Sequence, residues 1–188
     1  MTEIQSLNHF SMLSRLFGNL FARNPQDNIL APVFNYLQQQ GLSQLWVLET
    51  DTLSQQALEN VQLPIALDLL AQEYDKLFVH NPKVSNLLSD YSIDEKAFHQ
   101  FRLERAMPRL ESAVNFGQVL LTASWLEDNT ASPLAQHALF EQFLLPFAHK
   151  FLTQVETNAS LPFYRSLAYL TRELLSAMAD ELEEIQEA

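Results

Sequence analysis

The sequence contains no cysteine and only three glycines, and each shortage excludes whole classes of function. Without cysteine, the 188-residue chain can form no disulfide, thiolate nucleophile, zinc knuckle or cysteine-ligated iron–sulfur cluster. The glycines stand at positions 18, 41 and 117, so neither GxGxxG nor GxxxxGKS/T, the phosphate-binding motifs, can occur. Most nucleotide-dependent enzymes are therefore excluded.

Basic residues are also scarce. The chain has 11 lysines and arginines against 23 aspartates and glutamates, which gives a formal net charge of −12. Such an acidic chain repels the phosphate backbone, so we expect no nucleic-acid partner. The first residues, Met1-Thr2-Glu3-Ile4, carry an acid where a secretory signal requires basic residues, and we therefore expect a cytoplasmic protein.

Long apolar runs suited to a membrane are missing as well. Of two uncharged stretches, 112–126 is too short to span a bilayer, and 28–48 contains Pro32, Gly41 and four glutamines. Apolar residues nevertheless make up 47% of the chain, which is enough for a single well-packed domain of this length. We expect no membrane partner.

Apolar residues recur at steps of three and four along almost the whole chain, which is the period of amphipathic helices. This pattern predicts helices over about 7–20, 27–40, 51–60, 64–78, 92–106, 114–127, 132–155 and 162–185, with 45–48 as a connector. Gly41 is expected to end the second helix, Pro64 to open the fourth and Ser92 to cap the fifth. Strand-like alternation is absent, so we predict an all-α fold.

Two segments of this pattern differ from ordinary amphipathic helices. Residues 114–127 are apolar on nearly every side, which is typical of a central, buried helix. Residues 80–90 contain turn formers and no apolar stripe, and they predict an ordered loop. Tyr74, Phe78 and Tyr91 flank this loop. Aromatic residues at helical spacing usually belong to the core, but beside a loop they can also line a groove for a peptide.

Few residues are arranged for catalysis. His137 and Glu141 stand one helical turn apart and His149 follows three turns later, so a third metal ligand is missing within reach. Such residues are more typical of a polar helix surface. We therefore predict no catalytic residues, no metal site and no cofactor. A metal-dependent hydrolase that uses these three residues is the alternative from a different functional class.

Two clusters of charge suit binding. Arg102, Arg105 and Arg109 form a basic stripe, which either pairs with the protein's own acids or receives a carboxylate or phosphate group. The last nine residues contain no base and five acids, namely Asp180, Glu181, Glu183, Glu184 and Glu187. These acids are either a solvated helix end or a cradle for a basic peptide, which they would attract electrostatically.

Several segments, in their order and spacing, resemble the TorD/DmsD family of redox-enzyme maturation chaperones. They are Tyr74-x-x-Leu77-Phe78-Val79, the run from Leu120 to Asp128, Phe143-Leu144-Leu145-Pro146-Phe147, and Pro162-Phe163-Tyr164-Arg165-Ser166-Leu167-Ala168 with Leu170-Thr171-Arg172-Glu173. The YcdY branch of the family is the most similar, through Phe10-Ser11-Met12-Leu13-x-Arg15, Asn24-Pro25-Gln26-Asp27 and the acidic end at 180–184. The resemblance covers essentially the whole chain.

The resemblance implies a single-domain helical bundle of the TorD-like type, with no enzymatic activity of its own. Its halves, about 1–106 and 118–188, would be joined by a hinge near 107–117. The implied partner is a client metalloenzyme, which such chaperones bind through a twin-arginine signal peptide or near the cofactor pocket. Typical clients are molybdenum-cofactor oxidoreductases, whereas relatives of the YcdY branch are associated with a zinc-containing metallophosphoesterase-type client.

The resemblance leaves two further questions open. Members of the family can exchange helical halves, so both a monomer and a domain-swapped homodimer are compatible with it. A purely structural adaptor, which would keep one partner permanently, is a further alternative to a chaperone that releases its client.

The family signature at the hinge, Pro-x-Asp-His-x-Gly, falls on residues 112–117 and is largely replaced. Only Gly117 is kept, whereas Val114 and Asn115 stand in place of the aspartate and histidine. We expect the client groove to surround this segment and the aromatic loop. Its predicted residues are Tyr74, Phe78, Asn81, Pro82, Tyr91, Asn115, Phe116, Gly117 and Trp125.

Overall fold

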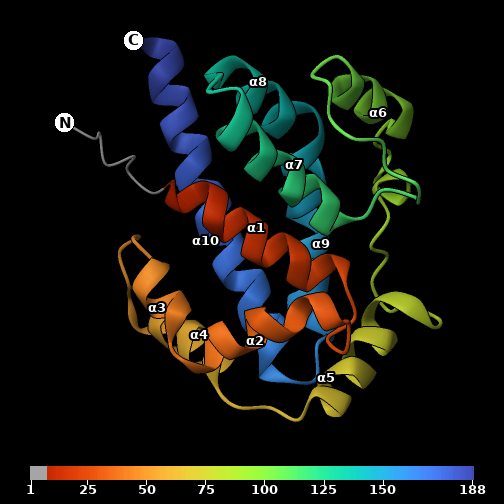
Figure 1. Cartoon of the computed structure of the whole chain (residues 1–188), viewed down its shortest axis with the longest axis vertical. Coiled ribbons are helices and arrows are strands. Elements are labelled where there is room, and N and C mark those ends of the chain that lie inside the picture. The colour runs from red at the N-terminus through yellow and green to blue at the C-terminus, as the bar shows by residue number, and fades with distance from the viewer. Residues whose placement is uncertain (1–7) are drawn as a thin grey trace.

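The predicted apolar stripes lie on helices in the computed structural model, which describes residues 8–188 (Figure 1). The α-helices are α1 (His9–Ala22), α2 (Ala31–Gln38), α3 (Gly41–Leu45), α4 (Thr52–Gln62), α5 (Leu67–Tyr74), α6 (Glu95–Leu103), α7 (Phe116–Asn129), α8 (Pro133–Leu139), α9 (Leu145–Asn158) and α10 (Pro162–Glu187). No strand occurs within residues 8–188, where the only β-type pairing is an isolated bridge between Leu87 and Asn115. The all-α prediction is confirmed.

Helix α1 crosses the middle of the molecule, with α7 on one side and α2 to α4 on the other, and α10 passes behind it (Figure 1). The main contacts of α1 are with α7, and those of the 26-residue α10 are with α4 and α9. Asn8 caps α1 by accepting a hydrogen bond from the Ser11 amide at 2.9 Å. Leu7, predicted as the first residue of this helix, lies outside the described residues.

Phenylalanine rings fill the centre of the core. The ring of Phe21 on α1 lies 5.3 Å from Phe116, 5.5 Å from Phe151 and 6.5 Å from Phe78, measured between centroids. All three contacts are edge-to-face, an arrangement that stabilises a pair by about 0.5–1.5 kcal/mol beyond its buried area. These rings join α1, α7, α9 and the segment 75–79 that follows α5 into one core.

Helices α1 and α7 touch through glycines. A Cβ atom on Gly117 would lie 2.2 Å from the carbonyl oxygen of Gly18 and 2.6 Å from the amide nitrogen of Ala22. Because both obstacles are backbone atoms, no side-chain movement relieves the clash. Gly117 and Gly18 therefore allow a close crossing that any larger residue prevents.

The predicted end of the second helix and the predicted start of the fourth helix are wrong. Gln40, with a φ of 62°, takes the left-handed turn after α2, and Gly41 instead begins α3, a short helix that we did not predict. Gly41 lacks a side chain because the Tyr36 ring occupies the space, 2.3 Å from where a Cβ would lie. Pro64 lies in the connection after α4, and α5 begins only at Leu67.

The predicted cap of the fifth helix is also wrong. Ser92 has a φ of 59°, whereas an N-cap residue is normally extended. Asp94 caps α6 instead, by accepting hydrogen bonds from the amides of Lys96 and Ala97 at 2.9 and 3.2 Å. The loop that precedes it is ordered, as predicted, and includes the 3₁₀ turn η3 (Leu88–Tyr91).

The helix predicted over 132–155 follows one course through α8, the π-helical η4 (Phe140–Leu144) and α9. Pro146, in the first turn of α9, has no amide hydrogen to donate to a preceding carbonyl, and the wider π turn lies directly before it. A second π segment, η2 (Asp75–Val79), continues α5. None of the helices in the described part of the chain is long and apolar enough to cross a membrane.

Candidate functional site

Three of the predicted groove residues belong to the core. Phe116 is completely buried, and Tyr74 and Phe78 are 7% and 9% exposed. The Tyr74 hydroxyl donates a hydrogen bond to the Phe21 carbonyl at 3.1 Å. Burial, with a smaller contribution from Asp75, raises the pKa of Tyr74 to about 12, so this hydroxyl stays neutral as a donor. In this conformation the three rings offer almost no surface to a client.

The remaining predicted residues lie at different depths around this core. Tyr91 is half-buried, with its ring 4.7 Å from that of Phe147 and its hydroxyl donating to the Ser85 carbonyl at 2.6 Å. Burial, and then the charge of Asp90, raises the pKa of Tyr91 to about 12. Asn81 and Pro82 are exposed in the loop.

The residues of the degenerate signature have structural contacts. The Asn115 side chain accepts a hydrogen bond from the Gln118 amide at 3.0 Å, and the Gln118 side chain accepts one from the Asn115 amide at 2.9 Å. This capping box begins α7. Trp125 lies eight residues further along α7, about 12 Å from Gly117 at 1.5 Å per residue.

The three arginines of the basic stripe lie in different environments, and pairing with the protein's own acids holds for Arg105, which lies 3.8 Å from Glu104. Arg102 is buried and donates hydrogen bonds to the Thr122 hydroxyl and, at 2.8 Å, to the Pro108 carbonyl, so it joins α6 to α7 and the next loop. Burial lowers its pKa. The Arg105 guanidinium lies 3.8 Å from the centroid of the Phe101 ring, and only Arg109 is exposed. Arg102 and Arg109 both line a cavity of about 370 Å³, together with Lys96 and His99.

The residues of the metal-hydrolase alternative are separated. His137 Nδ1 lies 3.8 Å from Glu141 Oε2. His149 instead lines a cavity together with Arg172 and Asp180, and neither His137 nor Glu141 is in its lining. Across residues 8–188, no three histidine, aspartate or glutamate side chains come together in a way that could hold a metal ion.

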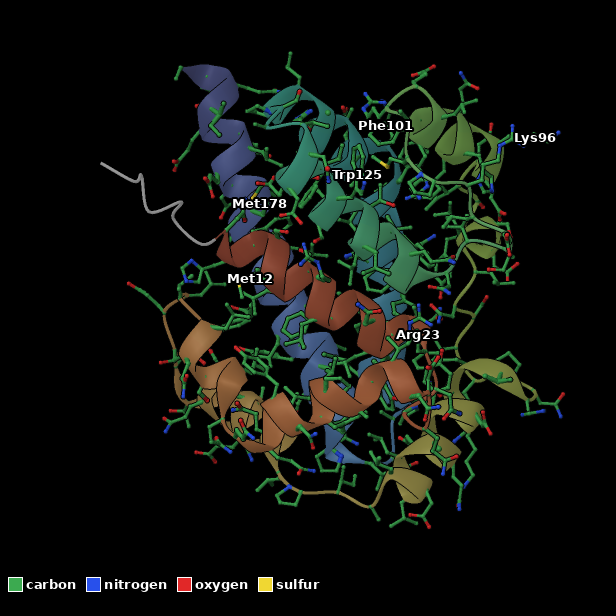
Figure 2. The ribbon with its side chains drawn as sticks, in the orientation of Figure 1. Met12, Arg23, Lys96, Phe101, Trp125 and Met178 are labelled. Carbon is green, nitrogen blue, oxygen red and sulfur yellow. The ribbon has the colours of Figure 1, made fainter. Side chains whose placement is uncertain are left out.

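A cavity of about 280 Å³, which we call the N-terminal groove, opens where the first turns of α1 meet α10 and residues 47–48. Met178 of α10 lies near this end of α1 in Figure 2. The side chains that line the groove are mainly apolar, namely Phe10, Leu13, Leu48, Leu174, Ala177 and Met178. Val47, which is 58% exposed, stands with them, and the polar lining residues are Asn8, His9, Glu127 and Glu181.

Glu127 is held in this groove without an opposite charge. Its two carboxylate oxygens accept hydrogen bonds from the side-chain amides of Asn8 at 2.8 Å and Gln136 at 2.7 Å. The described part of the chain offers it no ion-pair partner, whereas the adjacent Asp128 pairs with Arg15. The half-buried carboxylate of Glu127 therefore lies at the edge of an apolar cavity with neutral side-chain amides as its hydrogen-bond donors.

A second cavity of about 260 Å³, the lateral groove, lies further along α1, and its lining includes Met12, Leu16, Val33 and Tyr36. Leu45 lines the lateral groove and Val47 lines the N-terminal groove, so the short segment 45–47 connects the two linings. Both volumes fall below the roughly 300–1,000 Å³ of typical small-molecule pockets, which suits single side chains of a peptide better than a whole cofactor.

Sequence reasoning missed the N-terminal groove because its parts are far apart in the chain. Asn8 and Glu127, which are hydrogen-bonded, are separated by 119 positions. The one local signal is the adjacent pair Val47-Leu48 after Trp46, an apolar run outside any predicted helix. No spacing rule connects that run to α10.

The comparisons with known proteins give a consistent result over the full length of the chain. No family model matches it. It is 59% identical over 184 residues to an uncharacterized protein of Haemophilus influenzae, covering 98% of this chain and 100% of that one. It is 36% identical over 187 residues to the chaperone protein YcdY of Escherichia coli, covering 96% and 100%. It is 25% identical over 207 residues to the Tat proofreading chaperone DmsD of Salmonella paratyphi A, covering 97% and 95%.

Proposed function

The chain belongs to the TorD/DmsD family of redox-enzyme maturation chaperones, and we propose that it holds one client metalloenzyme in the cytoplasm until a metal or molybdenum centre is inserted. The observation that carries this proposal is full-length similarity to YcdY, a named chaperone, and to DmsD, which is named as a proofreader of the Tat pathway. The proposed mechanism is transient burial of a client segment, with no chemical step.

The client segment that we propose is basic and apolar, as in a twin-arginine signal peptide. A chain with a net charge of −12 attracts such a segment at a distance, which raises the rate of encounter. Apolar contacts then slow its release. Among the predicted groove residues, those with exposed surface are the candidates for contact with the rest of the client, namely Asn81, Pro82, Tyr91, Asn115 and Trp125.

A titration tests this proposal. A synthetic twin-arginine signal peptide is added to the full chain at two salt concentrations while Trp46 and Trp125 fluorescence is recorded. We expect saturable binding that weakens as salt rises, because the encounter is electrostatic. The control is the same peptide with both arginines replaced by glutamine, which should bind more weakly. Absence of saturable binding of the arginine peptide at both salt concentrations would contradict the proposal.

The class of client needs a separate experiment. Affinity purification of the tagged chain followed by mass spectrometry distinguishes an exported molybdenum enzyme from a zinc-containing metallophosphoesterase. An exported enzyme is expected to be recovered with its signal peptide intact, because the chaperone would bind it before export. Recovery of one partner that is never released would instead favour the structural adaptor.

A further inference from the structure

We propose that the N-terminal groove is the site that binds the basic–apolar segment of the client, with Glu127 and Glu181 facing its cation. This inference rests on the proposed function and assigns it a place in the fold. The groove lies apart from the loop and hinge residues that were predicted from the sequence, none of which lines it.

The floor of the groove suits an apolar side chain. Phe10 and Leu48, at its sides, are half-buried and present surface to a bound side chain, whereas Leu13, Leu174 and Met178 are buried beneath that surface. Methionine side chains adapt to partners of different shape, which suits a site that receives a variable apolar sequence. Val47 remains 58% exposed, an apolar side chain that a bound segment would cover.

The charges of the groove select a basic occupant. Glu127 on α7 and Glu181 on α10 both line it, whereas none of its lining residues is a lysine or an arginine. The two amides that bind Glu127 satisfy one lone pair on each oxygen, which leaves each oxygen able to accept a bond from a guanidinium group. An acidic peptide, or a second copy of this chain with its net charge of −12, would be repelled.

The size of the site suits an extended segment. The N-terminal groove takes one or two side chains, and the lateral groove, whose lining also includes Arg15, lies further along α1. Helix α1 has 14 residues and is therefore about 21 Å long, which matches about six residues of extended peptide. A pair of arginines followed by an apolar run fits this length.

Binding of a fluorescein-labelled twin-arginine peptide, measured by anisotropy, tests the site. Glu127→Gln and Glu181→Gln are each expected to weaken affinity by about fivefold and to reduce its salt dependence. Val47→Arg, which adds a like charge at an exposed position, is expected to weaken it by about tenfold. The matched controls are Glu59→Gln and Val79→Arg, at exposed positions outside the groove, which should change affinity by less than about twofold.

The outcomes separate the site from the function. If the unmodified chain fails to bind the peptide, the proposed client segment is wrong. If it binds but Glu181→Gln and Val47→Arg, both at exposed positions, bind equally well, the assignment of the groove is wrong and the proposed function stands. If deletion of residues 2–7 tightens binding of the peptide tenfold, the occupant of the groove is instead the chain's own first residues. A dimer that Val47→Arg dissociates, with peptide affinity unchanged, would make a second copy the occupant.

Discussion

At the scale of single residues, the packing of α7 on α1 requires a glycine at position 117, whether or not a client binds. It is the one signature position that the chain keeps, and it allows α7 to lie against the backbone of α1. The neighbouring Asn115 caps α7. Retention of the glycine therefore says little about peptide binding, because the crossing of the two helices alone requires it.

Substitution of this glycine tests the crossing. Gly117→Ala should lower the free energy of unfolding by at least about 3 kcal/mol, at the upper end of overpacking effects, because the two atoms nearest to its Cβ are backbone atoms of Gly18 and Ala22. Urea denaturation followed by circular dichroism measures the change. Ser176→Ala, at an exposed position of α10, is the control and should change stability by less than about 0.5 kcal/mol. An unchanged midpoint for Gly117→Ala would mean that the two helices can move apart at little cost.

At the scale of elements, the helices could be predicted from periodicity because each buries one stripe of apolar residues. The helices predicted to begin near 51 and 132 do begin there, because Asp51 and Ser132 cap them by accepting hydrogen bonds from the amides of Ser54 and Ala135. Ser92 was chosen wrongly because Asp94 stands two residues later, and only the backbone conformation separates the two. Local chemistry fixed the elements but left some of their ends ambiguous.

The candidate site depends on how elements meet, which periodicity does not contain. From the sequence alone, a phenylalanine such as Phe116 could belong either to the core or to a groove. In the structure it is completely buried and belongs to the core. The N-terminal groove combines α1, the segment after α3, α7 and α10. Its two acids were visible in the sequence, but only the tertiary fold places Glu127 and Glu181 in the lining of one cavity.

The contact of α6 with α7 and the loop after α6 depends on the guanidinium of Arg102. Arg102→Lys should lower stability by about 1.5–3 kcal/mol, because one ammonium group cannot reproduce the two hydrogen bonds of the guanidinium to Thr122 and Pro108. Arg109→Lys, the same change at an exposed position, should alter stability by less than about 0.5 kcal/mol. Thermal denaturation of both variants measures the difference. Equal melting temperatures for Arg102→Lys and Arg109→Lys would mean that Arg102 contributes no more to stability than an exposed arginine.

At the scale of the whole molecule, the two predicted halves are interleaved. Helix α1 from the first half packs mainly on α7 from the second, and α10 from the second packs on α4 from the first. The halves therefore share one core, in which Phe21 contacts both Phe116 and Phe151. An exchange of halves between two chains would keep every one of these contacts, so a closed monomer and a swapped dimer differ chiefly in the path of residues 107–117.

Separation of the halves tests this interdependence. Fragments 1–106 and 107–188, expressed separately, should each lack a cooperative thermal transition, because each exposes the core face that the other covers. Mixing them in equal amounts should restore both the helical circular dichroism signal and a cooperative transition, since the two fragments together keep all the residues of the shared core. The intact chain serves as the reference for full recovery. A cooperative transition from fragment 1–106 alone would instead make the first half an autonomous unit, and the hinge would then join two domains rather than divide one core.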